Sequence, residues 1–462
     1  MRRQGTPPFR SSRRRLRTLS RGCLMVLLIA AGPAWPQDFR LPPSLLLPNY
    51  DRVYPGLFEA LEAGAFTARA MDAPAVAYNP AGLGLTERST VNASAQGYQL
   101  TAVGGSGFQH ATPVSSFETI PGFVGVVLSR DVLGWETVRL GFAVVTPVHW
   151  DQTVTGNSTP SEGQRISYGV HSSFSTVVPT FAVGWAVSSS IRLGASIEFP
   201  YTSLSDTGQL SGELTTTTMS QGTVRTVAAG GSTLDVDAVA GAQWSALRWL
   251  HLGLLFRSPG LKVLSTGSFV YESLATPTSG SRHISFTDPN ARFEYRSPME
   301  VVLGAAVELG PVQVEMDIRW HDGTHTYPLF SSTTEGRVVD TTSGAPVVSS
   351  FGFPGVPYRA RQLWNGNVGA RIRLSQWVSL HGGVYLDQSP VDLLGQGFRR
   401  VDLIGFRTGV GFQADKLSAS LGVGWENGKA TDDLSPDGTV ASQQDQLTLN
   451  TFSVLFSLSY KF

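Results

Sequence analysis

The chain has 462 residues, with 35 basic and 35 acidic side chains and hence no formal net charge at pH 7. Nucleic-acid-binding proteins carry a basic excess or a basic stripe, so we expect no nucleic-acid partner. The single cysteine, Cys23, lies close to the N-terminus, which leaves the rest of the chain without disulfides or cysteine-based metal sites. We expect no cofactor and no bound metal.

The N-terminal 37 residues have the three parts of a secretory signal peptide. A basic stretch at 2–21 precedes the short apolar run CLMVLLIAA at 23–31, and small residues at 32–34 offer a cleavage position. A membrane-spanning helix would need roughly 17 to 25 apolar residues, which is more than this run provides. We therefore expect residues 1–37 to be a signal peptide and the remaining chain to be exported.

Residues 38–87 differ from the rest of the chain. The stretch 63–78 is rich in alanine and predicts a helix, which stops at Asn79-Pro80. Pro80 lacks a backbone donor and disfavours helical geometry at Asn79, whereas Gly82 lets the chain turn freely. The sequence therefore predicts a small helix and a turn ahead of the first strand. A helix-to-strand turn without a function of its own is the alternative.

From residue 88 onward, apolar and polar side chains alternate with period two, which is the pattern of β-strands. In 311–320, for example, Val314 and Met316 fall on one face and Glu315 and Asp317 on the other. We count about fourteen such strands by this periodicity. They lie at 88–100, 121–130, 136–149, 177–188, 190–203, 234–246, 249–268, 295–309, 311–322, 359–374, 376–388, 400–414, 416–428 and 446–462.

The connections between these strands alternate between long and short. The long ones lie at 101–120, 150–176, 204–233, 269–294, 323–358, 389–399 and 429–445, and the short ones near 133–134, 189, 247–248, 310, 375 and 415. Bacterial outer-membrane barrels have an even number of antiparallel strands, with short turns at one end and long loops at the other. A soluble sandwich has no reason to sort its loops in this way. The sequence therefore predicts an all-β fold, a transmembrane antiparallel β-barrel over residues 88–462.

Aromatic side chains support the barrel. The last strand has an apolar stripe that ends at Phe462, and it resembles the C-terminal pattern by which barrel assembly machinery recognises outer-membrane proteins. Tryptophans near strand ends are typical of the membrane interfaces. Those of this chain are Trp150, Trp244, Trp320, Trp377 and Trp425. We expect a monomer in the outer membrane of a Gram-negative bacterium, in contact with lipid and lipopolysaccharide.

The sequence resembles the FadL/TodX family of outer-membrane transporters for long-chain fatty acids and other hydrophobic compounds. The resemblance rests on Gly64-Ala65, Ala70, Asp72-Ala73 and Asn79-Pro80-Ala81-Gly82-Leu83, on passages at 253–269, 295–320 and 377–392, and on the C-terminal LSYKF. It implies that residues 38–87 form a hatch, or plug, in the lumen of a fourteen-stranded barrel. The hatch motif consists of Asp72, Asn79, Pro80, Ala81 and Gly82. Pro74 departs from the family, whose members more often carry a small hydroxyl residue there.

The resemblance also implies a mechanism, the passive uptake of hydrophobic molecules such as long-chain fatty acids. The cargo would bind in the lumen, the hatch would rearrange, and a kink in the third strand would open the wall sideways into the bilayer. In the third strand, 136–149, Gly141 and Pro147 are the candidates for this lateral opening, because Gly weakens and Pro breaks a ladder. An ordinary bulge at these positions is the alternative.

The alternation directs charged side chains toward the lumen, where most are expected to pair because charges away from water need partners. They are Arg192, Asp235, Asp237, Arg257, Glu315, Asp317, Arg319, Arg371, Arg373, Asp387 and Arg407. A fatty-acid carboxylate would need a cation at the end of its pocket. The candidates are Arg257, Arg319, Arg371 and Arg407. A neutral hydrocarbon would need none of them.

Other functions compete with fatty-acid uptake. They are the uptake of aromatic hydrocarbons or other lipophiles by the same route, a general porin for polar solutes, a barrel enzyme and an adhesive surface protein. We expect no enzymatic activity, because the sequence has neither a Gly-x-Ser-x-Gly motif nor an HExxH pair. His321 and His325 provide only two of the ligands that a metal site needs. The external loop at 323–358 has enough apolar side chains to serve as a first capture site.

Overall fold

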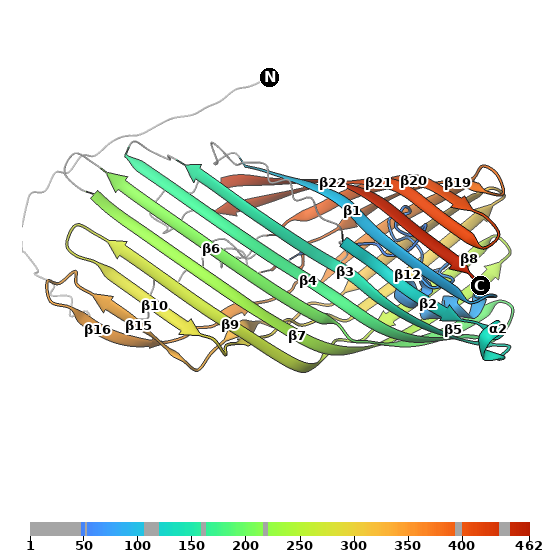
Figure 1. The fold of residues 1–462 in the computed structure, drawn as a ribbon, viewed down its shortest axis with the longest axis horizontal. Coiled ribbons are helices and arrows are strands. Elements are labelled where there is room, and N and C mark those ends of the chain that lie inside the picture. The colour runs from blue at the N-terminus through green and yellow to red at the C-terminus, as the bar shows by residue number, and fades with distance from the viewer. Residues whose placement is uncertain are drawn as a thin grey trace, which may run out of the picture. The chain divides into compact units, whose positions relative to one another are not determined.

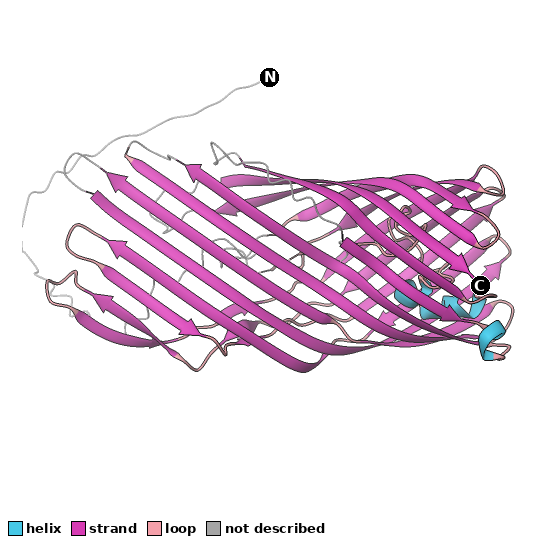
Figure 2. Cartoon of the chain, in the orientation of Figure 1, coloured by secondary structure: helices cyan, strands magenta, loops and turns pink. Residues whose placement is uncertain are grey.

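The computed structural model describes residues 48–50, 53–105, 120–158, 163–215, 220–392, 400–433 and 444–462. The predicted signal peptide, 1–37, and the beginning of the predicted plug, 38–47, lie outside this part of the chain. Strands make up most of the described residues, and the helices are short (Figure 2). Within the same residues, no helix is long and apolar enough to cross a membrane.

Fourteen strands of the described residues form a closed antiparallel β-barrel, which confirms the predicted fold (Figure 1). The last strand, β22, pairs with the first, β1, and so closes the ring. In order around the barrel, the strands are β1 (Thr90–Gly105), β2 (Ile120–Leu128), β3 (Val138–Ser158), β4 (Gln164–Ala186), β5 (Ile191–Glu198), β7 (Ser220–Leu247), β8 (Leu250–Arg257), β12 (Glu300–Leu309), β13 (Val312–His321), β18 (Leu363–Arg373), β19 (Val378–Asp387), β20 (Asp402–Gln413), β21 (Leu417–Asp433) and β22 (Gln444–Lys461).

The short connections predicted from the sequence are confirmed. They lie at 129–137, where the helix α2 (Arg130–Leu133) is inserted, and at 187–190, 248–249, 310–311, 374–377 and 414–416. Because successive strands run in opposite directions, these connections all lie at the same end of the barrel.

At the other end, strands continue where long loops were predicted. The additional strands of the main sheet are β6 (Tyr201–Thr215), β9 (Leu261–Thr276), β10 (Arg282–Asp288), β15 (Glu335–Asp340) and β16 (Val347–Gly352). The prediction of loops at 150–176, 204–233 and 269–294 was therefore wrong over most of these ranges. These stretches are rich in Ser, Thr and Gly. Strands that do not face lipid need no apolar outer side, so the alternation that marks membrane strands is missing there.

The outer face of the barrel is apolar. In β13, Met316 and Ile318 are 48% and 40% exposed, whereas Glu315 and Asp317 are fully buried on the inner face, as the alternation predicts. Such a ring of strands satisfies its own backbone hydrogen bonds and offers apolar side chains to lipid. Trp150 was wrongly assigned to the membrane interface, because it belongs to a buried apolar cluster and is only 6% exposed.

Residues 53–87, called the inner segment below, pack against the inner face of the barrel wall. The regular elements of this segment are the single helical turn α1 (Ala75–Tyr78) and the 3-10 helix η1 (Pro80–Leu85). Nearly every side chain of the segment is buried. The helix predicted over 63–78 was wrong except for its last turn. Ala63 and Asp72 adopt left-handed backbone conformations, with φ of 54° and 56°, and these conformations interrupt a right-handed helix.

A second, three-stranded sheet also packs against the barrel wall. Its strands are β11 (Arg292–Phe293), β14 (Tyr327–Ser331) and β17 (Val356–Tyr358). A Cβ added to Gly231 of β7 would collide with Phe293, and one added to Gly267 of β9 would collide with the carbonyl of Ala291, so this sheet lies directly on the wall. Tyr327 and Phe330, from the predicted capture loop, are buried in one apolar cluster together with Trp150 and Phe293. They are part of the interior and not an exposed loop.

Candidate functional site

Glycines let the inner segment approach the barrel wall closely. Ten wall strands each contribute a glycine at which an added Cβ would collide with the inner segment. They are Gly141, Gly184, Gly194, Gly241, Gly253, Gly304, Gly369, Gly383, Gly409 and Gly422. At Gly241, for example, the Cβ would overlap the side-chain oxygen of Asn79. In the sequence, this packing appears as a glycine at an inward-facing position in many of the strands. The alternation of polar and apolar residues does not distinguish these glycines from other inward-facing residues, so they were not predicted.

Asn79 of the predicted hatch motif joins the inner segment to two wall strands. The side-chain amide donates to the backbone carbonyls of Ala242 in β7 at 3.1 Å and of Leu254 in β8 at 3.3 Å. It also donates to the carbonyl of Thr67 within the inner segment at 2.9 Å. The side-chain oxygen accepts from the N–H of Ala81 at 3.2 Å and so caps the start of η1. A buried Asn suits this position because its NH₂ group donates and its oxygen accepts, so both polar groups of the amide have partners.

The other residues of the hatch motif hold the turns on either side of α1. Asp72 forms an ion pair with Lys461 of β22 at 3.4 Å, and its N–H donates to the hydroxyl of Thr86 at 3.2 Å. Burial raises the pKa of the Asp72 carboxyl, and Lys461 opposes this shift. Pro80 occupies the first position of η1, and Gly82 lies so close to an earlier turn that no Cβ would fit.

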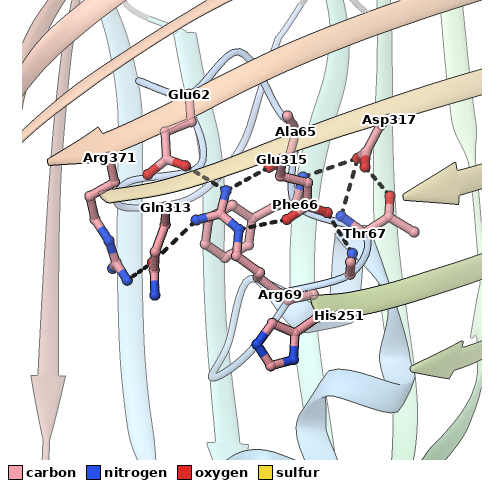
Figure 3. A network of polar contacts seen from close by, with 12 residues as sticks. Glu62, Ala65, Phe66, Thr67, Arg69, His251, Gln313, Glu315, Asp317 and Arg371 are labelled. Carbon is pink, nitrogen blue, oxygen red and sulfur yellow. Dashed lines mark hydrogen bonds and ion pairs between the residues drawn. The ribbon is translucent and has the colours of Figure 1, made fainter. Parts of the chain in front are cut away.

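A buried ion-pair network fixes the middle of the inner segment (Figure 3). The guanidinium of Arg69 pairs with Glu62 at 2.6 Å and with Glu315 of β13 at 2.7 Å. A ring nitrogen of His381 in β19 lies 2.7 Å from the second oxygen of Glu62. Burial by itself would raise the pKa of Glu62, but Arg69 and His381 outweigh burial and lower the pKa to about 2. All four side chains are buried, so removing one would leave its partners without compensation.

Two neighbouring carboxylates of β13 hold a turn of the inner segment (Figure 3). Asp317 accepts hydrogen bonds from the N–H groups of Phe66 at 3.0 Å and Thr67 at 3.1 Å, and from the Thr67 hydroxyl at 2.7 Å. Glu315 accepts from the N–H of Ala68 at 2.6 Å. The alternation predicted that both carboxylates face inward. It did not predict that they bind the backbone of a segment about 250 residues earlier in the chain.

A further carboxyl group, that of Glu59, is buried without a cation. Glu59 is 4% exposed, and its carboxylate accepts from the N–H of Phe58 at 2.9 Å. Among the described residues, no Lys, Arg or His side chain forms an ion pair with it. Burial raises the pKa of Glu59 to about 7, and the negative charge of Glu62 adds to this shift.

The raised pKa of Glu59 predicts a pH dependence of the inner segment. Because the folded-state pKa of about 7 lies above the unfolded value of 4.5, the contribution of Glu59 to stability is complete below pH 4.5 and is lost as the pH rises through 7. Hydrogen-exchange protection of the inner segment should therefore fall between about pH 5 and about pH 8. Glu59→Gln should remove this part of the pH dependence, whereas the exposed control Glu213→Gln should keep it. Equal profiles for Glu59→Gln and wild type would contradict the prediction.

A cavity of about 160 Å³ lies between the inner segment and the barrel wall. Tyrosines contribute much of its aromatic surface, namely Tyr50, Tyr54, Tyr78 and Tyr295. The wall strands β3 and β4 contribute an apolar side with Val145, Pro147, Val148 and Val178. Ligand sites in proteins are mostly apolar and carry a few convergent polar groups, and this cavity has that character.

Wall strands are interrupted beside this cavity. The pairing of β3 with β4 shifts register between Val145 and Val148, so Pro147 stands outside the regular ladder. The pairing of β3 with β2 reaches only as far as Val145 among the described residues. The carbonyl of Pro147 instead accepts a hydrogen bond at 2.9 Å from the N–H of Val53 in the inner segment. A further break in the strands at 199–200 borders the same cavity through Pro200, and Arg257, the last residue of β8, also lines it.

The structure separates the two residues predicted for a lateral opening. Pro147 lies at the interruption of β3 and lines the cavity. Gly141 lies in regular pairing with Val127 of β2 and Ala182 of β4. A Cβ at Gly141 would contact Val76 of the inner segment, so this glycine belongs to the close-packed ring of wall glycines.

Two of the four predicted ligand cations line the cavity. Arg257 donates from Nε and Nη2 to Glu198 at 2.9 Å and 3.2 Å, and from Nη1 to Glu300. Arg319 donates to Glu300 at 3.5 Å and to the carbonyl of Gly64 at 3.4 Å. Both guanidinium groups are therefore already engaged by protein acceptors.

The other two predicted cations lie elsewhere in the lumen. Arg371 donates to Gln313, near the network around Arg69 (Figure 3). Arg407 is 1% exposed, lies 4.7 Å above the ring of Tyr54 and pairs with Glu426 at 3.6 Å. Neither residue lines the cavity.

The remaining charges predicted to face the lumen are buried, with one exception. Arg192, Asp235, Asp237 and Asp387 are at most 5% exposed. Arg373 is exposed, because it is the last residue of β18. No group of three or more potential metal ligands was found among the described residues.

The fold is similar to that of several solved outer-membrane channels. The channel CymD, described as a monoaromatic hydrocarbon channel, has a TM-score of 0.53 and 12% sequence identity, over 88% of this chain and 97% of that chain. A FadL homologue from Pseudomonas aeruginosa has a TM-score of 0.54 and 13% identity, over 91% and 100%. The toluene transporter TodX from Pseudomonas putida has a TM-score of 0.54 and 12% identity, over 90% and 100%.

These similarities concern the fold. No family model matches the sequence, and no curated protein matches it. The fold expected from the sequence resemblance to FadL and TodX is nevertheless confirmed over most of the chain. A closed barrel of this fold, with an apolar outer face, places the chain in the outer membrane of a Gram-negative bacterium.

Proposed function

We propose that this chain carries hydrophobic molecules passively across the outer membrane. The observation that supports the proposal most directly is the cavity of about 160 Å³ between the inner segment and the interruption of β3 at Pro147. A molecule bound there touches an obstructing segment on one side and a weakened wall on the other. The structures of similar fold include channels described as carrying monoaromatic hydrocarbons and toluene, and these functions agree with the proposal.

The volume of the cavity favours a small cargo. An engineered cavity of roughly 150 Å³ in another protein holds one benzene molecule, so the cavity observed here suits a single aromatic ring. A long-chain fatty acid would require the cavity to grow, and hence a displacement of the inner segment. Aromatic hydrocarbons and similar lipophiles are therefore our first candidates, and long-chain fatty acids the second.

The route combines a hatch and a lateral exit. We propose residues 38–87 as the hatch and 88–462 as the barrel, after removal of a signal peptide at 1–37. When the cargo displaces the inner segment, the hydrogen bond from Val53 to the carbonyl of Pro147 is lost. The wall at Pro147 then lacks both ladder partners and inner support. The cargo leaves through this point into the bilayer and avoids water.

The inner segment argues against the competing functions. A porin for polar solutes needs an open lumen, whereas the inner segment lies against glycines of ten wall strands. We propose transport and no catalysis. The expected partners are a hydrophobic ligand, membrane lipid, lipopolysaccharide and the barrel assembly machinery, and the closed ring of strands needs no second subunit.

The lateral exit predicts a specific loss of uptake. Pro147→Val restores an N–H donor to β3, and a regular ladder should then close the wall. We expect the uptake of labelled toluene by cells to fall at least about tenfold, a barrier increase of about 1.4 kcal/mol, while the barrel still assembles. Pro179→Val is the matched control, because Pro179 lies in β4 in regular pairing with Val144. Unchanged uptake by assembled Pro147→Val would remove the lateral exit from the proposal.

A further inference from the structure

The cavity is rich in carboxylates at its polar end. Three acidic side chains line it, Glu198, Asp237 and Glu300, against the two guanidinium groups of Arg257 and Arg319. A ligand carboxylate would therefore arrive as a fourth acid beside two cations.

Both guanidinium groups are already engaged by protein acceptors. Arg257 uses all three of its side-chain nitrogens on Glu198 and Glu300. Arg319 contacts Glu300 and the carbonyl of Gly64. A carboxylate ligand would share these two cations with three acids and add a further negative charge to the cavity, which is unfavourable away from water.

Asp237, unlike the two arginines, presents a hydrogen-bond acceptor to the cavity. It lines the cavity from β7, is 2% exposed, and its Oδ1 has no hydrogen-bond partner among the described residues. A buried acceptor without a donor raises the free energy of the empty site. A ligand that brings an O–H donor would satisfy this oxygen, and a hydrocarbon would not.

We propose that the cavity selects a small aromatic lipophile with a hydroxyl donor, of the phenol class, and rejects the corresponding carboxylate. Asp237 accepts the hydrogen bond from the hydroxyl group, and the tyrosines and valines of the cavity pack against the ring. This inference rests on the proposed function and specifies the cargo for the same site.

Three ligands that share a methyl-substituted ring test the inference, namely 4-methylphenol, toluene and 4-methylbenzoate. Their binding to the purified full chain in detergent is measured by titration calorimetry. We expect 4-methylphenol to bind about tenfold more tightly than toluene, since a hydrogen bond to a buried acceptor contributes about this factor. We expect 4-methylbenzoate to bind more weakly than toluene.

Variants of two aspartates locate the effect. Asp237→Leu should bind 4-methylphenol no more tightly than toluene while keeping its affinity for toluene. Asp237→Asn, which keeps a neutral acceptor and nearly the same shape, should show an intermediate preference and covers the case in which the Leu variant does not fold. Asp235→Leu is the matched control, since Asp235 is equally buried two residues away in β7 and does not line the cavity.

The outcomes separate this inference from the proposed function. Equal affinity for 4-methylphenol and toluene in the wild type overturns the inference and leaves hydrophobic uptake standing. A preference for 4-methylphenol over toluene that is undiminished in both Asp237→Leu and Asp237→Asn also overturns the inference and leaves hydrophobic uptake standing. Binding of none of the three ligands overturns the proposed function, and the inference with it.

Discussion

The Gly241→Val variant should conduct ions, whereas we expect the wild-type lumen to be closed. A valine side chain at this position would occupy the space of the Asn79 amide. The amide would then lose its hydrogen bonds to the carbonyls of Ala242 and Leu254, and the inner segment would lose its attachment to β7 and β8. Overpacking of this kind costs about 1–3 kcal/mol before the lost hydrogen bonds are added. Conductance in planar lipid bilayers measures the result.

A second glycine provides the control for this experiment. A Cβ at Gly212 of β6 would meet no atom within 4 Å, so Gly212→Val should leave the conductance at the wild-type level. Circular dichroism and heat-modifiable migration in gels show whether each barrel has assembled. An assembled Gly241→Val barrel with wild-type conductance would mean that the inner segment is not held by the close packing described above.

Arg69→Met should loosen the inner segment without changing the barrel. The substitution leaves the carboxylates of Glu62 and Glu315 buried without their common cation. Removing one partner of a buried ion pair costs about 3–5 kcal/mol, so exchange of inner-segment amides through local opening should accelerate by about 10² to 10³. Hydrogen exchange followed by mass spectrometry measures this acceleration separately for the inner segment and for the wall strands.

An exposed arginine provides the matched control for Arg69. Arg130 pairs with Glu136 at 3.6 Å, and both side chains are largely exposed. Exposed pairs contribute at most about 1 kcal/mol, so Arg130→Met should leave exchange of the inner segment unchanged. If Arg69→Met and Arg130→Met gave the same exchange pattern, the buried network would not be the attachment that holds the inner segment.

The barrel could be predicted from the sequence because each membrane strand carries its own information. Within β13, the alternation of Val314 and Met316 with Glu315 and Asp317 fixes which face meets lipid, whatever the rest of the chain does. Most of β6 and the second half of β9 were predicted as loops, whereas the beginning of each falls within the predicted strands 190–203 and 249–268. Their extent is set by pairing with β7, and a single strand does not encode that pairing.

The candidate site could be predicted only in part. The alternation directs Arg257 inward, but its contacts with Glu198 and Glu300, which were not predicted, depend on the register among β5, β7, β8 and β12. The partners of Asn79 lie 163 and 175 residues away in the sequence, and no local pattern indicates them. Pro147 and Gly141 looked alike as possible interruptions of β3. Only the pairing distinguishes them, since a glycine fits a regular ladder and a proline has no donor for it.

The inner segment and the cavity form one functional unit. The wall glycines allow close approach, the buried charges fix the position, and Val53 reaches the interrupted strand at Pro147. We propose that this arrangement excludes water and ions in the resting state, and that the exit of a bound lipophile depends on the same segment.

The central claim is that hydrophobic cargo passes a barrel that stays closed to polar solutes. The most direct test compares uptake of labelled toluene and of a labelled disaccharide by cells with and without this chain in the outer membrane. The account predicts faster uptake of toluene and unchanged uptake of the disaccharide. Faster entry of the disaccharide, or unchanged entry of toluene, would contradict it.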